Sequence, residues 1–309
     1  MTDPAWRPAL PPGRVLQVPG LGRVFLRDVT GPPGAPVVFL LHGWTATADL
    51  NWYPSYAALA ERYRVVAFDH RGHGRGLRTR KRFRLEDCAD DAVALADALA
   101  IDRFIPVGYS MGGPIASLIW RRNPERVRGM VLCATACRFG TTRLVRAELA
   151  MFAPLALSTR VMPRRMSKPM YGRVVASRTK NGDLQEWAIN EILSCEPRQV
   201  LEAGAALQRF DSRDWIQAID VPTSVVVVDG DEIVPTHSQD DLAERIPGAH
   251  VVRVTGRHDV CVRHPRRFVT ALGAAVAAAA GEPATASRPD EREASSGAPN
   301  DPERGAVAS

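Results

Sequence analysis

Short apolar runs alternate with amphipathic stretches over most of this 309-residue chain. Two alternating runs at 14–18 and 23–29, separated by the turn of residues 19–22, predict an antiparallel hairpin. Beyond them the pattern predicts buried strands and helices in alternation. Strands are expected at 37–41, 64–68, 103–107, 127–133, 223–228 and 249–254, and helices at 53–63, 85–100, 113–120, 238–246 and from 264 onward. This pattern predicts an α/β fold, with a mostly parallel sheet flanked by helices.

The alternation stops between residues 138 and 210, where prolines, aromatics and helical stretches occur without a clear strand. An insertion of this kind is expected to form a helical cap over the carboxyl ends of the strands, where ligands bind in such sheets. The tail is rich in Pro, Ser, Ala, Gly and charges, a composition typical of disorder. We therefore expect a flexible N-terminus (1–13), a core (14–137 and 211–280), a helical cap (138–210) and a disordered tail (281–309).

A serine lies in a sharp turn between a predicted strand and a predicted helix. The segment Gly108-Tyr109-Ser110-Met111-Gly112 has the pattern G-x-S-x-G. Glycines allow such a turn because a side chain there would collide with the neighbouring strand or helix. Between a strand and a helix, this pattern is that of a nucleophile elbow, which presents the serine hydroxyl above the sheet. Ser110 is therefore the candidate nucleophile.

A serine hydroxyl needs a base that removes its proton, and the base needs a carboxylate that fixes its tautomer. His258 follows a predicted strand and precedes a helix, so it is the candidate base. Asp229 and Asp231 both follow the apolar run 225–228, and either could supply the carboxylate. Asp259 is set aside because a residue adjacent to the base in sequence points away from it. Among the other histidines, we expect structural hydrogen bonding for His70 and His73. We expect surface or cap-facing positions for His237 and His250, and an exposed position for His264.

An acyl-transfer site also needs hydrogen-bond donors for the oxyanion of the tetrahedral intermediate. The segment Leu41-His42-Gly43-Trp44 directly follows a predicted strand. Its turn can present the Trp44 N–H to the site, and the Met111 N–H, just after the serine, would be the second donor. His42 is expected to brace this loop. We also expect His42, Gly43 and Tyr109 to lie at the substrate-binding surface.

Taken together, these motifs resemble those of the α/β-hydrolase superfamily, in the serine hydrolase branch with an HG-x oxyanion loop and a cap after the sixth strand. The resemblance implies the α/β-hydrolase fold with an inserted helical cap. It also implies that Asp231, in a D-x-x-V-P stretch, is the triad acid, with Asp229 as the fallback. The matching segments are 41–44, 68–74, 108–113, 231–235 and 256–258.

Composition narrows the classes of function. The chain has a net charge of +6, but no aromatic-interleaved basic stripe that would indicate nucleic-acid binding. It has no apolar run of eighteen residues and no secretory signal pattern, so we expect a cytoplasmic protein. Its five cysteines lack metal-ligand spacing, and we predict neither a metal nor a cofactor. Between 138 and 182, either the apolar residues pack on the core and the arginines are solvated, or the two together form a surface that admits acyl chains or contacts an anionic membrane.

We therefore expect a cofactor-independent serine hydrolase, esterase-like or lipase-like, that cleaves carboxylic esters of small to medium apolar acyl groups through an acyl-enzyme. A perhydrolase or a C–C bond hydrolase would use the same triad. A non-catalytic ligand-binding protein with this fold is the alternative from another class, because one fold hosts many functions. The sequence predicts no oligomeric state.

Overall fold

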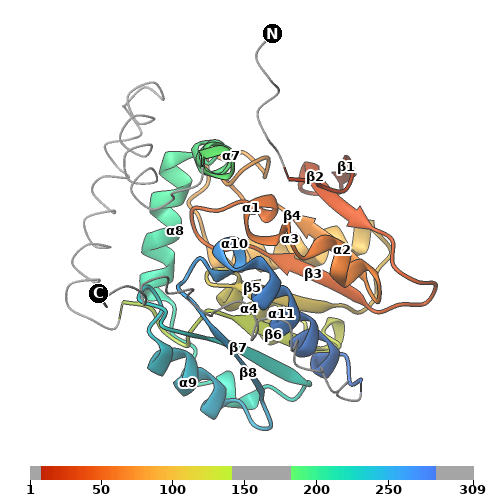
Figure 1. The fold of residues 1–309 in the computed structure, drawn as a ribbon. Coiled ribbons are helices and arrows are strands. Elements are labelled where there is room, and N and C mark those ends of the chain that lie inside the picture. The colour runs from red at the N-terminus through yellow and green to blue at the C-terminus, as the bar shows by residue number, and fades with distance from the viewer. Residues whose placement is uncertain (1–7, 141–181, 283–309) are drawn as a thin grey trace, which may run out of the picture.

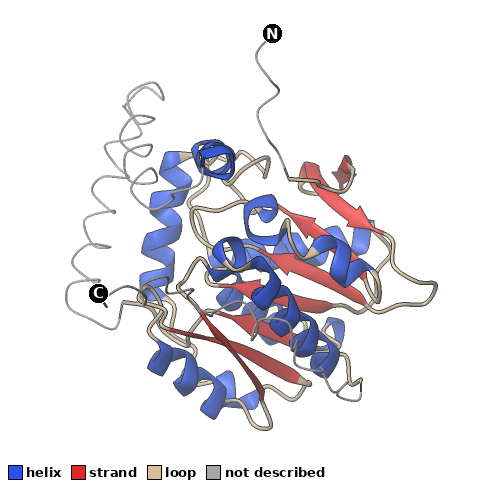
Figure 2. Cartoon of the chain, viewed as in Figure 1, coloured by secondary structure: helices blue, strands red, loops and turns tan. Residues whose placement is uncertain are grey.

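The computed structural model describes residues 8–140 and 182–282. In this part of the chain, one sheet of eight strands runs in the order β1-β2-β4-β3-β5-β6-β7-β8 (Figures 1 and 2). The first hairpin and β4 pair antiparallel, and the other neighbours pair parallel. The strands are β1 (Gly13–Val18), β2 (Gly22–Val29), β3 (Val37–Leu41), β4 (Arg64–Phe68), β5 (Ile105–Tyr109), β6 (Met130–Cys133), β7 (Thr223–Asp229) and β8 (His250–Thr255). The predicted hairpin and mostly parallel sheet are confirmed.

Helices cover both faces of the sheet. Side chains of α3, α4 and α9 share one hydrophobic core with one face of the strands, and those of α1, α2, α10 and α11 share a second core with the other. The described helices are α1 (Ala48–Trp52), α2 (Tyr56–Ala60), α3 (Leu85–Ala98), α4 (Gly112–Arg122), α7 (Gly182–Leu193), α8 (Pro197–Arg209), α9 (Thr236–Arg245), α10 (Val260–Arg263) and α11 (Pro265–Ala279), with 3₁₀ turns η1 (Pro124–Arg126) and η2 (Ile216–Ala218).

The central strands are buried on both faces, which explains their nearly continuous apolar sequences. In β3, Phe39 and Leu41 join the core of α3 and α4, whereas Val38 and Leu40 join the core of α11. All four of these side chains are fully buried. The two cores therefore hold the sheet rigid between them.

The segment after β3 differs from the prediction of a single helix over 53–63. Two short helices, α1 and α2, occupy residues 48–60. The Thr47 side chain caps α1 by accepting a hydrogen bond of 3.1 Å from the Leu50 N–H. Pro54 lies between the two helices, where it cannot donate a backbone hydrogen bond. A further helix of four residues, α10, follows His258 and was not predicted.

The predicted cap lies partly outside the described residues. Within 138–210, α7 and α8 are described, and 141–181 are not. Trp187 and Ala188 of α7 pack with Ala46 and Leu50 at the start of α1, so α7 lies on the core just after the oxyanion loop. The lipid-facing hypothesis concerns mainly the segment outside the described residues and stays a prediction. Residues 1–7 of the predicted flexible N-terminus and 283–309 of the predicted disordered tail also lie outside them.

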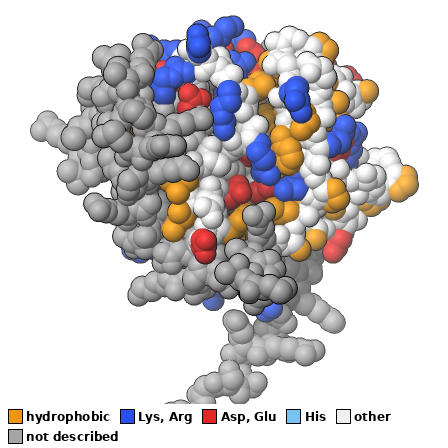
Figure 3. All heavy atoms as spheres, turned by 90° about the horizontal axis from the view of Figure 1, so that it is seen from above, with side chains coloured by type: hydrophobic (Ala, Val, Ile, Leu, Met, Phe, Trp, Pro, Cys, Tyr) orange, Lys and Arg blue, Asp and Glu red, His pale blue; other side chains and the backbone are white. Residues whose placement is uncertain are grey.

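The described surface mixes side chains of different kinds. On the face seen from above, Lys and Arg side chains lie among acidic and apolar ones (Figure 3). In the described part of the chain, no helix combines the length and apolar character that a membrane span requires.

The register of the sheet brings the ends of four strands to one edge. Tyr109 at the end of β5 pairs with Cys133 of β6, and Cys133 pairs with Val226 of β7. Asp229 at the end of β7 pairs with Thr255 at the end of β8. Segments that follow these strands therefore meet at their carboxyl ends, although they are far apart in sequence.

Candidate active site

Ser110 occupies a strained backbone conformation between β5 and α4. Its φ is +53°, in the left-handed region that non-glycine residues rarely adopt. Two glycines allow the turn. A Cβ at Gly108 would lie 2.2 Å from the Gly112 carbonyl oxygen, and one at Gly112 would lie 2.1 Å from that of Leu41. Strain of this kind persists where the surrounding structure fixes it, which is common at functional sites.

Hydrogen bonds fix the strained turn. The Ser110 N–H donates to the Cys133 carbonyl over 2.9 Å. The Ser110 carbonyl accepts from the Thr135 hydroxyl over 2.8 Å and from the Gly113 N–H over 2.9 Å. The backbone of the serine is thus tied to the end of β6 and to the start of α4. The Ser110 hydroxyl takes no part in these bonds and contacts the segment that follows β8.

His258 lies between Ser110 and Asp231. Its Nε2 is 3.0 Å from Ser110 Oγ, and its Nδ1 is 2.7 Å from Asp231 Oδ2. Both distances are within hydrogen-bond range. Because a carboxylate accepts only, Nδ1 carries a proton and donates it to Asp231. Nε2, which faces the serine hydroxyl, is then the ring nitrogen that can accept its proton.

Asp231 is fixed by its own loop. Its side chain has no exposed surface, and Oδ1 accepts from the Ile233 N–H over 2.9 Å and the Val234 N–H over 3.0 Å. Oδ2 also lies 3.2 Å from Nε2 of Gln239, a fully buried residue of α9. These donors satisfy a buried carboxylate that would otherwise be costly to ionise.

Asp229 does not take part in this arrangement. It lies two residues earlier, at the end of β7, and pairs with Arg253 of the edge strand β8 over 2.8 Å. Its side chain is 38% exposed, compared with none for Asp231. The structure therefore gives the fallback acid a surface ion pair and places only Asp231 beside His258.

The loop after β3 runs alongside the elbow. A Cβ at Gly43 would lie 3.3 Å from the Cβ of Ser110, so the Gly43 backbone passes directly over the serine. The Gly43 N–H donates to Asn51 Oδ1 over 2.6 Å, and Thr45 turns the chain with a φ of +61°. The Gly43–Trp44 peptide is thereby held near the hydroxyl.

The chain matches proteins of known fold and activity. The family model described as alpha/beta hydrolase fold matches residues 36–172. Over 253 residues the chain is 23% identical to 3-oxoadipate enol-lactonase 1 of Acinetobacter baylyi, which covers 80% of this chain and 91% of that protein. The thermophilic esterase from Thermogutta terrifontis superposes with a TM-score of 0.70 at 23% identity, covering 85% of this chain and 97% of that structure. The chain has the α/β-hydrolase fold and is similar to members of that superfamily.

The chain is also similar to the non-heme chloroperoxidase of Streptomyces lividans. The two are 28% identical over 223 residues, which make up 69% of this chain and 80% of that protein. The family model and the relatives support a hydrolase activity for the chain. These relatives differ in the reactions that their names describe.

His42 braces the oxyanion loop from beneath. It is fully buried, its Nε2 accepts from the His70 N–H over 2.9 Å, and its Nδ1 lies 2.8 Å from the Gly43 carbonyl. Burial lowers the pKa of His42, partly offset by the charge of Asp69, so the ring is neutral and Nδ1 donates. With both nitrogens bound to backbone, His42 has no atom left for a substrate, which corrects its assignment to the binding surface.

Tyr109 is also buried, and its role differs from the one predicted. Its hydroxyl donates to the His258 carbonyl over 2.6 Å. Desolvation, the largest effect, raises the pKa of Tyr109 well above its usual value, so the phenol stays protonated and donates. Tyr109 therefore supports the loop that carries the imidazole and does not line a binding surface. Nothing in its sequence context distinguished these two roles.

The Trp44 indole points toward α8. Its Nε1 donates to the Val200 carbonyl over 2.7 Å, and a Cβ at Gly204 would lie 2.7 Å from the indole ring. The side chain therefore connects the oxyanion loop to a helix of the predicted cap. The indole nitrogen of Trp44 is therefore bound within the protein, and the proposed oxyanion role concerns its backbone N–H.

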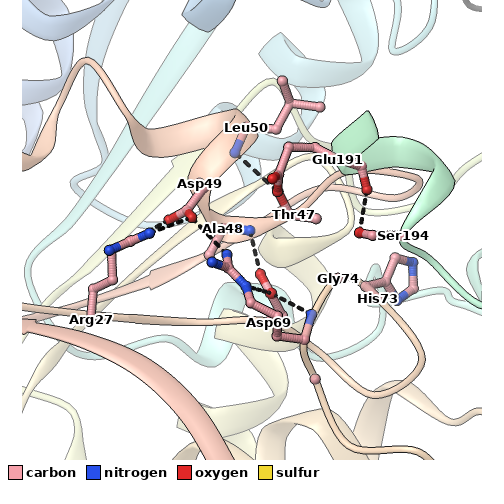
Figure 4. A network of polar contacts seen from close by, with 12 residues as sticks. Arg27, Thr47, Ala48, Asp49, Leu50, Asp69, His73, Gly74, Glu191 and Ser194 are labelled. Carbon is pink, nitrogen blue, oxygen red and sulfur yellow. Dashed lines mark hydrogen bonds and ion pairs between the residues drawn. The ribbon is translucent and has the colours of Figure 1, made fainter. Parts of the chain in front are cut away.

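A network of ion pairs on two buried carboxylates, Asp49 and Asp69, lies at the start of α1 (Figure 4). The Arg27 guanidinium donates to both Asp49 oxygens over 2.6 and 2.7 Å. Arg75 bonds Asp49 over 2.7 Å and Asp69 over 3.3 Å. Burial would raise the pKa of Asp49, but Arg27 and Arg75 hold it below its usual value. The Asp69 carboxylate also accepts from the Ala48 N–H over 2.7 Å, so the network fixes the start of α1.

Proposed function

We propose that this α/β hydrolase is a cofactor-independent serine hydrolase that cleaves carboxylic esters of small to medium apolar acyl groups. The observation that carries the proposal is the continuous line from Ser110 Oγ through the His258 ring to Asp231, with distances of 3.0 and 2.7 Å. A nucleophile, a base and a carboxylate in this order form the arrangement required for acyl transfer.

In the proposed reaction, Ser110 Oγ attacks the ester carbonyl carbon while His258 Nε2 takes the hydroxyl proton. The N–H groups of Trp44 and Met111 donate to the oxyanion that forms. His258 then gives its proton to the departing alkoxide, and the alcohol leaves behind an acyl-enzyme on Ser110. Water next loses a proton to His258 and attacks the acyl carbon, which releases the carboxylic acid and restores the serine.

Each proposed role has a structural support. The buried Asp231 carboxylate stabilises the imidazolium that forms during each proton transfer. The positive φ of Ser110 keeps the hydroxyl at the carboxyl edge of the sheet. The hydrogen bond that the Gly43 N–H donates to Asn51 Oδ1 holds the loop that carries the Trp44 donor. These features favour acyl transfer over a ligand-binding role without catalysis.

The first test combines a fluorophosphonate probe with p-nitrophenyl esters of increasing chain length. We expect the protein to be labelled and to hydrolyse the esters, and Ser110→Ala to lose labelling and at least about 10³-fold of the turnover. Ser117→Ala is the matched control, because Ser117 is buried in α4 and its hydroxyl donates to the Gly113 carbonyl. Unchanged turnover in Ser110→Ala would rule out the proposal.

Peracid formation is a second candidate for the same site. The chain is 38% identical over 103 residues, a third of its length, to a bifunctional esterase/perhydrolase DCH of Acinetobacter calcoaceticus. In this reaction hydrogen peroxide would replace water in the attack on the acyl-enzyme, giving a peracid. Measuring peracid and carboxylic acid from one ester in the presence of peroxide separates the two outcomes.

A further inference from the structure

Gln239 is a buried amide beside the carboxylate of the proposed triad. Its Nε2 lies 3.2 Å from Asp231 Oδ2 and 2.7 Å from the Val234 carbonyl, and its Oε1 accepts from the Val228 N–H over 2.9 Å. The residue has no exposed surface. Its acceptor atom is therefore directed at β7, and its N–H groups are directed at the loop that follows β7.

These contacts fix the orientation of the amide. Because a backbone N–H faces one end of the side chain, that end must be the oxygen, and the NH₂ end must face the two acceptors. A flipped amide would oppose oxygen to oxygen at Asp231 and at Val234. The N–H that reaches Asp231 Oδ2 is thus determined by the backbone at the end of β7.

The same N–H acts on the oxygen that faces the imidazole. Asp231 Oδ1 is held by two backbone N–H groups, whereas Oδ2 receives Gln239 and His258. A second donor at Oδ2 directs the remaining lone pair toward His258 Nδ1. It also withdraws charge from that oxygen, which makes the carboxylate a weaker partner for a protonated imidazole.

We propose that Gln239 is a positioning residue that aims Asp231 at His258 and sets how strongly the carboxylate holds the imidazole proton. This inference rests on the serine hydrolase function proposed above. It assigns a role to a residue of α9 that touches neither Ser110 nor the oxyanion loop.

Gln239→Met keeps the length of the side chain and removes its hydrogen bonds. Without the second donor, Asp231 Oδ2 attracts the imidazolium more strongly, so the proton leaves only at higher pH. We expect the acid limb of the pH–rate profile to move to higher pH and kcat to fall about tenfold, with KM changed by less than about twofold.

Gln239→Glu should change the alkaline end of the pH–rate profile, in contrast to the acid limb changed by Gln239→Met. It places a second carboxyl group 3.2 Å from Asp231 Oδ2 if the side chain keeps its position. Two carboxyl groups this close share one proton, and they repel when both ionise. We expect activity near that of the wild type at the acid end and a new loss at the alkaline end of the profile.

Thr236→Val is the control for loss of local structure. The Thr236 hydroxyl accepts from the Gly230 N–H over 3.3 Å and donates to the Val228 carbonyl over 3.1 Å, so it stabilises the same turn without touching Asp231. We expect this variant to lower the melting temperature and to leave the shape of the pH profile unchanged.

The profiles are measured both by ester turnover and by the rate of fluorophosphonate labelling at Ser110. Shifted profiles in both Gln239 variants and an unshifted one in Thr236→Val support the inference, and wild-type profiles in all three overturn it. If the wild type neither labels nor turns over, the serine hydrolase proposal fails separately. The Nδ1–H resonance of His258 by NMR then decides: a change in Gln239→Met but not in Thr236→Val supports positioning, and no change overturns it.

Discussion

Two acidic residues, two positions apart, lie in very different surroundings at the end of β7. Asp229 pairs with Arg253 on the surface, whereas Asp231 is buried against His258. In an extended strand successive side chains point to opposite faces, but β7 ends at Asp229 and Gly230 turns the chain with a φ of +93°. This turn, and not the order of residues, directs the second carboxylate toward the imidazole.

Asparagine substitutions separate the two acids. We expect Asp231→Asn to lower kcat by about 10³–10⁴-fold, because an amide cannot stabilise the imidazolium and favours the wrong tautomer. Asp229→Asn removes a surface ion pair worth about 0–1 kcal/mol and should leave ester turnover within about twofold. Steady-state kinetics on one p-nitrophenyl ester measure both. Equal losses in the two variants would contradict the assignment.

At the scale of single residues, some positions could be predicted from sequence and others could not. The positions of Ser110 and His258 could be predicted. The glycine pattern marks the turn that carries the serine, and the histidine directly follows a predicted strand. The position of Gln239 could not be predicted, because a glutamine on an amphipathic helix gives no sign that it is buried. Tyr109 was misjudged because its position beside the serine does not show that its hydroxyl turns toward the loop of His258.

At the scale of elements, the strands were predicted well because burial on both faces makes them continuous apolar runs. Short helices were not. Helix α1 has five residues and α10 has four, which are too few for a periodic pattern. The positions of these two helices depend on tertiary contacts. For example, the Ala48 N–H at the start of α1 donates to the carboxylate of Asp69, which lies in a distant part of the chain. Contacts of this kind leave no local signal in the sequence.

Helices α7 and α8 connect the predicted cap to the loop beside Ser110. The Thr47 hydroxyl bonds Glu191 of α7 over 2.5 Å, and the Trp44 indole bonds the Val200 carbonyl of α8 over 2.7 Å. Both contacts begin between β3 and α1, in the loop that carries the proposed oxyanion donor. The position of these helices and the geometry of the loop are therefore coupled, which the sequence could not indicate.

For the whole molecule, the stability should depend on a cluster of buried histidines. The His42 ring lies 4.2 Å from that of His70 and 5.4 Å from that of His73, between ring centres. Burial lowers the pKa of all three, and the pKa of His73 to about 3. Part of the structural hydrogen bonding predicted for His70 and His73 is present. The His73 Nδ1 lies 2.9 Å from the Arg71 carbonyl, whereas both His70 ring nitrogens lack a partner among the described residues.

The lowered pKa values of the three histidines determine how the stability of the protein depends on pH. In the unfolded chain each histidine takes up a proton below its ordinary pKa of about 6.5, whereas the folded protein keeps the rings neutral. The contribution of these histidines to stability is therefore complete above about pH 6.5 and is lost as the pH decreases. For His73 the loss continues toward pH 3, at about 1.4 kcal/mol per pH unit.

Urea unfolding between about pH 7.5 and about pH 5 measures this slope. We expect His73→Gln to reduce the slope of stability against pH by about the contribution of one histidine. We expect His250→Gln, at an exposed position, to leave the slope unchanged. Equal slopes in the wild type and in His73→Gln would show that the buried ring does not contribute.

The proposed reaction depends on a covalent acyl-enzyme at Ser110 Oγ. Mixing the protein with p-nitrophenyl acetate, quenching in acid and mapping peptides by mass spectrometry tests this directly. We predict an acetyl group on the peptide that contains Ser110, absent in Ser110→Ala and formed far more slowly in His258→Ala. Consumption of the ester without an acetylated Ser110, or with the acetyl group on another residue, would contradict the account.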